Sequence, residues 1–195
     1  MLENLKLKVV EIAKKAEQLG FCKYKSGNFS IKEGKYILLT PSGIIREKMI
    51  IDDIIVMDTE GNIIEAKTNL KPSSEYLMHL EIYKQRPSLN SIVHTHSKFA
   101  TSFAVANREI LPVVSEAILI FEKDGKARVA PYATPGSLEL AMNTANILKD
   151  YNVCLMEKHG AITASEKGLE DAFLKTQYLE EVAEIYYHSL NLINK

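Results

Sequence analysis

Three histidines carry the chemistry that this chain most clearly offers. His94 and His96 stand one residue apart in an apolar run, and His159 follows about sixty positions later, beside Gly160. Because strand side chains alternate, the first two point to the same side of a strand. Three neutral imidazoles with one open position describe a catalytic zinc site. A His-x-His pair also occurs by composition alone, so the third histidine, next to a glycine that permits close approach, strengthens the metal interpretation.

Glu75 is the candidate acid–base group. It follows two serines at the predicted start of a helix. A carboxylate near a divalent cation can bind the metal or transfer a proton. The alternative is that a glutamate at a helix N-terminus only interacts favourably with the helix dipole. His79 lies four residues later on the same helical face, where we predict a core or supporting histidine. His188 is predicted to be a surface or capping residue.

Three turns of small polar residues are candidates for binding an anion. They are Ser26–Ser30, Thr40–Gly43 and Pro72–Ser74. Backbone amides and hydroxyls in such turns bind phosphate, although serine, glycine and asparagine are also ordinary turn residues. If the turns converge on one anion, the substrate is a phosphorylated small molecule.

The composition places limits on the class of protein. The chain has 195 residues, 46% hydrophobic and 25% charged, with a net charge of -1. A near-neutral chain of this kind is expected to be a globular protein that does not bind nucleic acid. Its cysteines, Cys22 and Cys154, suggest no cysteine zinc site. We expect one domain over 1–195, no signal peptide or membrane span, and a cytoplasmic location.

The hydrophobic spacing predicts alternating helices and strands around these residues. The predicted helices cover residues 5–19, 75–85, 99–106, 135–148 and 169–190. The predicted strands cover residues 35–39, 54–57, 63–66, 91–96, 112–115, 127–130 and 153–156. Strands dominate the middle and helices the flanks, so we predict an α/β fold, with a mixed or antiparallel sheet covered by helices.

Six short segments, in order along nearly the whole chain, carry a family resemblance. They are Ser26–Ser30, Thr40–Gly43, Pro72–Glu75, Val93–His96, Ala130–Thr134 and Lys158–Gly160. On these segments the chain resembles the class II aldolase family of sugar-phosphate aldolases and epimerases, and most of all its L-fuculose-1-phosphate aldolase branch. The resemblance implies a central antiparallel sheet between helical layers, and a homotetramer with active sites at subunit interfaces.

The resemblance also implies roles for individual residues. Zinc, one ion per subunit, would be held by His94, His96 and His159, with another divalent ion such as iron, manganese or cobalt left open in its place. Glu75 would donate and accept the proton, and would touch the metal when substrate is absent. The substrate phosphate would be held by Gly27, Asn28, Ser42, Gly43, Ser73 and Ser74. Lys25 stands where the family often has a small hydroxylic residue and would add a charge to that site.

The implied reaction is reversible cleavage of L-fuculose 1-phosphate to dihydroxyacetone phosphate and L-lactaldehyde. A glutamate at position 75, where the epimerase branch has aspartate, favours an aldolase. A ribulose-5-phosphate 4-epimerase or a methylthioribulose-1-phosphate dehydratase on the same scaffold stays open. The chain also lacks the tyrosine that the fuculose aldolase has near the position of Glu116, and the longer tail that carries another. Which group protonates the leaving alkoxide is therefore an open question.

Overall fold

The computed structural model describes residues 2–193, in which eight strands form one sheet. In chain order the strands are β1 (Asn28–Glu33), β2 (Tyr36–Leu39), β3 (Ile55–Asp58), β4 (Ile63–Glu65), β5 (Ser91–Thr95), β6 (Arg128–Ala130), β7 (Val153–Met156) and β8 (Gly160–Ser165). Their spatial order is β4-β3-β2-β1-β5-β8-β7-β6. All neighbours are antiparallel except β6 and β7, so the sheet is mixed, as predicted.

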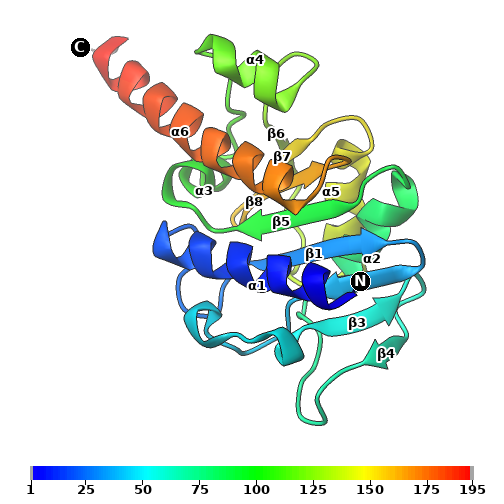
Figure 1. Cartoon of the computed structure of the whole chain (residues 1–195). Helices are drawn as coiled ribbons and strands as arrows, with labels where there is room; N and C mark the ends of the chain where they lie inside the picture. The colour runs from blue at the N-terminus through cyan, green and yellow to red at the C-terminus, as the bar shows by residue number, and fades with distance from the viewer. Residues whose placement is uncertain (1, 194–195) are drawn as a thin grey trace.

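Helices cover both faces of this sheet (Figure 1). One face packs on α2 (Tyr76–Gln85) and α5 (Leu138–Leu148). The other face packs on α1 (Leu2–Gln18), α3 (Lys98–Val105), α4 (Ser115–Phe121) and α6 (Leu169–Ile193). Two short 3-10 turns, Arg46–Lys48 and Ile51–Asp53, lead into β3. The predicted α/β class and the two helical layers are confirmed. None of the helices within 2–193 is long and apolar enough to cross a membrane.

The prediction of a strand at 112–115 is wrong. Val114 is extended, but residues 112–114 pair with no strand in the described chain, and Ser115 begins α4. Pro112 cannot donate a ladder hydrogen bond, which disfavours a strand. The helix α4 was missed because it has an apolar residue, Leu119, on its exposed face, so its sequence lacks the spacing of an amphipathic helix.

Two strands were not predicted. In β1, Phe29 and Ile31 face the α1 layer while Asn28 and Ser30 are buried on the opposite side, so its polar residues resembled a turn. In β8 the small residues Gly160, Ala161 and Ala164 lack the bulk typical of a central strand. Both strands flank β5, so the sheet's centre is where prediction failed.

Candidate active site

The three histidines meet at one end of the central strands. His94 lies on β5, His96 lies one residue beyond it, and His159 lies in the turn that joins β7 to β8. The pairing of Thr95 with Ala161 brings this turn beside the end of β5. The ring centroids are 4.8, 4.9 and 5.1 Å apart, with the rings steeply inclined to one another. One nitrogen from each ring lies within 4.8 Å of the others, as a shared ion requires.

Hydrogen bonding fixes the tautomer of His94. Its Nδ1 lies 2.9 Å from the Ala161 carbonyl, which can only accept, so Nδ1 carries the hydrogen. Nε2 is therefore the nitrogen that faces the site, 3.0 Å from Nε2 of His96. Burial lowers the pKa of His96 to about 3 and that of His159 to about 4, so neutral rings face the site near pH 7.

Gly160 is required for this arrangement. A Cβ at this position would lie 2.5 Å from the Thr95 carbonyl oxygen and 2.9 Å from Cδ2 of His96. It would also lie 3.2 Å from Cε1 of His94. The absence of a side chain thus lets β8 approach β5 closely enough for the rings to converge.

Glu75 immediately precedes α2 and directs its side chain at the histidines. Its Oε2 lies 3.3 Å from Nε2 of His94, and its Oε1 lies 3.1 Å from Nε2 of His159. Burial alone would raise the pKa of Glu75, but charge interaction with His94 and His159 and the Asn28 hydrogen bond outweigh it and hold the pKa below its usual range. Glu75 is therefore a carboxylate at neutral pH. The alternative, a glutamate that serves only the helix dipole, is not favoured, because its side chain faces the histidines and makes no capping bond.

A buried chain of hydrogen bonds stands behind Glu75. Asn28 Nδ2 donates to Glu75 Oε2 at 2.8 Å, so the Asn28 carbonyl oxygen faces His79 and accepts from its Nε2. His79 Nδ1 must then accept from the Ser30 hydroxyl at 2.7 Å, and Ser30 Oγ accepts from Tyr83 at 2.8 Å. Because a carboxylate can only accept, every donor in the chain is assigned. His79 is thus a supporting histidine, as predicted.

The residues present fit a divalent cation. Three imidazoles and a carboxylate are a donor set that zinc prefers. Glu75 Oε1, which faces His159 Nε2 at 3.1 Å, is buried and has no hydrogen-bond partner within 2–193. Such atoms are uncommon in folded proteins and indicate a ligand or ion at the site.

The three polar turns lie next to one another. Pro41 bridges Pro72, and the Ser42 amide donates to the Lys71 carbonyl at 2.9 Å. Ser73 donates to the Thr40 carbonyl at 3.2 Å. The turn that contains Gly27 packs against β5, where a Cβ on Gly27 would lie 2.7 Å from the His94 carbonyl oxygen.

The residues predicted to bind phosphate differ in which of their hydrogen-bonding groups lack a partner. Asn28 is buried, and both ends of its amide are engaged by Glu75 and His79. In contrast, the backbone amides of Gly27, Gly43 and Ser74 donate to no group in the described chain. These three amides come from three different turns, so they are the groups that can receive an anion.

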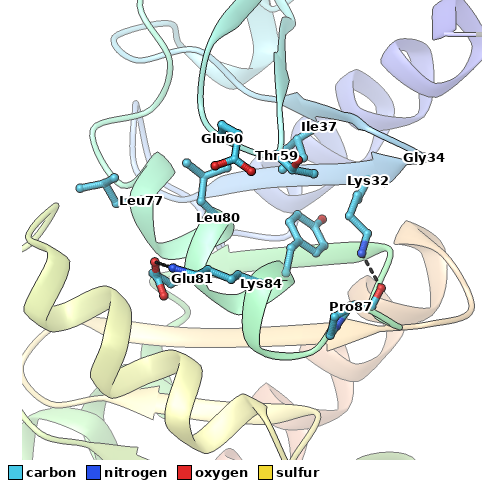
Figure 2. Close-up of a pocket in the computed structure, with 11 residues that line it drawn as sticks. Lys32, Gly34, Ile37, Thr59, Glu60, Leu77, Leu80, Glu81, Lys84 and Pro87 are labelled. Atoms are coloured by element: carbon cyan, nitrogen blue, oxygen red, sulfur yellow. Dashed lines mark hydrogen bonds and ion pairs between the residues drawn. The ribbon is translucent and has the colours of Figure 1, made fainter.

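A separate surface pocket lies where the β1–β2 hairpin, the β3–β4 turn and α2 meet (Figure 2). It is lined by Lys32, Glu60, Lys84 and neighbouring residues, and by none of the histidines. Tyr83 lines it and also ends the hydrogen-bond chain from Glu75. With no metal-binding or acid–base group in its lining comparable to the histidine site, this pocket is not the candidate active site.

The structure brings together the histidines and Glu75 that the sequence suggested, but the buried residues around the site and its turns were not predicted. Ser30, Tyr83 and Arg46 were not singled out, although polar residues within an apolar strand could have signalled Ser30. Arg46 and Tyr83 belong to none of the motifs, and their spacing in the sequence does not connect them to the histidines or to Glu75.

This fold and site define the class of protein. Residues 7–187 match the family model described as the class II aldolase and adducin N-terminal domain. The chain therefore belongs to the class II aldolase family, whose aldolases are metal-dependent lyases.

Individual relatives narrow the comparison. An L-fuculose phosphate aldolase of Methanococcus maripaludis is 37% identical over 166 residues, which are 85% of this chain and 87% of the relative. A 5-methylthioribulose-1-phosphate/5-deoxyribulose-1-phosphate aldolase of Rhodospirillum rubrum is 32% identical over 185 residues, 94% of this chain and 80% of the relative. A solved L-fuculose 1-phosphate aldolase superimposes with a TM-score of 0.90 at 31% identity, covering 97% of this chain and 87% of its own.

Proposed function

We propose that the chain is a zinc-dependent aldolase that reversibly cleaves L-fuculose 1-phosphate to dihydroxyacetone phosphate and L-lactaldehyde. The observation that carries the proposal is the meeting of His94, His96 and His159 around the Glu75 carboxylate, beside three adjoining polar turns. The similarity to L-fuculose phosphate aldolases supports this substrate.

His94, His96 and His159 would hold the zinc, with Glu75 as a further ligand when substrate is absent. Zinc supplies Lewis-acid stabilisation of the negative charge that develops on the sugar oxygens. Glu75 performs the proton transfer. In the synthetic direction its carboxylate removes a proton from the hydroxymethyl carbon of dihydroxyacetone phosphate, that carbon bonds to the aldehyde carbon, and the aldehyde oxygen takes up a proton. Cleavage is the reverse.

Asn28, held by His79, keeps one oxygen of Glu75 in place through a 2.8 Å hydrogen bond. The carboxylate is thereby aimed before substrate binds, which lowers the cost of orienting it. Gly27, Asn28, Ser42, Gly43, Ser73 and Ser74 would hold the substrate phosphate. For Asn28 this role requires its amide to exchange partners, or the backbone to serve instead.

A second candidate is an aldolase for 5-deoxyribulose 1-phosphate or 5-methylthioribulose 1-phosphate, the substrates named for the Rhodospirillum rubrum relative. It needs the same metal site and proton donor and differs only in the aldehyde released. The epimerase and dehydratase alternatives keep the scaffold but not the carbon–carbon cleavage. We further propose a cytoplasmic homotetramer with active sites at subunit interfaces; a monomeric mass in light scattering would contradict the assembly.

The test is an aldol condensation screen of dihydroxyacetone phosphate against small aldehydes, with and without chelator. We expect L-lactaldehyde to give L-fuculose 1-phosphate, and chelator to abolish the product. NMR analysis of products separates the alternatives, since an epimerase inverts a carbon and a dehydratase loses water. Product from another aldehyde alone would favour the second candidate, and unchanged turnover in chelator would contradict metal dependence.

A further inference from the structure

Arg46 is a buried cation that lies between two of the polar turns. Only 2% of it is exposed. Its Nη1 donates to the carbonyls of Pro41 at 3.4 Å and Ile44 at 3.1 Å. Its Nη2 donates to the carbonyls of Lys25 at 3.2 Å and of Gly27. One guanidinium therefore joins the turn Ser26–Ser30, with the preceding Lys25, to the turn Thr40–Gly43, with the following Ile44.

No carboxylate pairs with Arg46 in the described chain. All its acceptors are backbone carbonyls, and its Nε is buried without a hydrogen-bond partner. Burial lowers the pKa of Arg46 and Glu17 partly opposes this, but arginine begins so high that the guanidinium keeps its charge.

Arg86 shows what a paired arginine looks like in the same molecule. It also donates to backbone carbonyls, those of Leu148 and Tyr151. Unlike Arg46, it forms an ion pair with Glu166 at 2.9 Å. An arginine that binds backbone carbonyls in this molecule can therefore also have a carboxylate partner. Because a buried charge without a counter-charge is costly, its retention at Arg46 indicates that an anion supplies the partner.

The available donors lie on the turns that Arg46 joins. The free amides of Gly27 and Gly43 belong to the two turns whose carbonyls accept hydrogen bonds from Arg46. The free amide of Ser74 belongs to the third turn, which is bridged to Pro41 through Pro72. We propose that Arg46 is a specificity-determining residue that makes this cluster of turns selective for a doubly charged phosphate group. This inference rests on the proposed phosphate-binding role of the turns.

The test uses calorimetric titration of the full-length, metal-loaded protein with inorganic phosphate. Arg46→Gln removes the charge and should weaken phosphate binding by about tenfold or more. It should raise the KM for the phosphorylated substrate by a similar factor, with a smaller change in kcat. Arg46→Lys keeps the charge but cannot hold four carbonyls, so it should bind phosphate within about threefold of wild type despite a lower melting temperature.

Two controls separate charge from structural support. Arg86→Gln removes a carbonyl clamp remote from the turns and should leave phosphate affinity unchanged. Lys25→Ala removes the exposed cation that sequence reasoning placed near the site and should weaken phosphate less than Arg46→Gln does.

The outcomes are distinct. Wild-type affinity in Arg46→Gln, or equal losses in the Gln and Lys variants, would overturn the role of Arg46 while leaving the proposed function intact. If the wild-type protein itself binds no phosphate and does not distinguish phosphorylated from unphosphorylated substrate, the proposed function fails first. Should Arg46→Gln fail to fold, the Lys variant decides: loss of phosphate binding in a folded Arg46→Lys protein contradicts the proposal.

Discussion

The histidine corner (His94, His96, His159 and Glu75) and the turn cluster (the turns Ser26–Ser30, Thr40–Gly43 and Pro72–Ser74) are neighbours built by different means. Strand register places the corner, because β5 and β8 pair over five residues directly behind the rings. The cluster is joined by the Arg46 guanidinium, the bridge between Pro41 and Pro72, and hydrogen bonds between Phe29 and Thr40. The difference teaches that the corner side chains are held on, or directly beside, paired strands and the start of a helix, whereas the proposed phosphate-binding groups stand on loops.

The largest expected effect comes from removing a strand-borne ligand. His94→Ala should lose the metal and reduce aldol cleavage to background, because two imidazoles do not complete the site. Atomic emission on purified protein measures the metal. His188→Ala, an exposed histidine of α6, is the matched control and should keep one ion per subunit. An unchanged metal content in His94→Ala would contradict the ligand assignment.

The next effect tests whether the corner depends on its buried support. His79→Leu cuts the hydrogen-bond chain behind Asn28 and should lower kcat about 10- to 100-fold with little change in KM. His79→Gln keeps a side-chain N–H that can donate to Asn28, so it should recover most of that loss. The shorter side chain of His79→Asn can reach only Ser30, so this variant should not recover it. Steady-state kinetics on metal-loaded variants measures both parameters. Equal kcat in the Leu and Gln variants would show that His79 acts only by filling space.

A smaller effect tests the close approach of β8 to β5. Gly160→Ala places a Cβ 2.5 Å from the Thr95 carbonyl oxygen, so the strands must separate. We expect a loss of about 1–3 kcal/mol in unfolding free energy, together with weaker metal binding. Gly34→Ala, where nothing lies within 4 Å of the added carbon, is the control and should leave metal affinity intact. Wild-type metal affinity in Gly160→Ala would show that ring convergence does not need the glycine.

The smallest expected effect is a loss of folding stability at acidic pH. Burial lowers the pKa of His79 to about 3, from an ordinary value of 6.5. Below pH 6.5 the unfolded chain therefore binds a proton that the native state does not, so stability falls as the pH falls from 6.5 toward 3. His79 should account for about 1 kcal/mol of the loss between pH 6.5 and 5.5. Urea unfolding of wild type and His79→Leu measures it; parallel pH profiles would contradict the assignment.

Prediction from the sequence succeeded where one local pattern determines the structure. The long amphipathic helices α1 and α6, and the apolar strands β5 and β7, followed directly from spacing. It failed for β1 and β8, because their inward positions carry polar or small residues instead of apolar ones. Asn28 and Ser30 form the hydrogen-bond chain behind Glu75, and Gly160 lets the rings approach. Likewise, Arg46 acts through backbone carbonyls that no sequence pattern reveals.

Proton exchange at dihydroxyacetone phosphate in heavy water, followed by NMR without any aldehyde, tests the central claim most directly. If a histidine-held cation activates the substrate and Glu75 takes the proton, the wild-type protein should exchange one hydroxymethyl proton. Glu75→Gln should keep its metal yet exchange about 100-fold or more slowly. Exchange at the wild-type rate by metal-loaded Glu75→Gln, or by wild-type protein stripped of metal, would contradict the account.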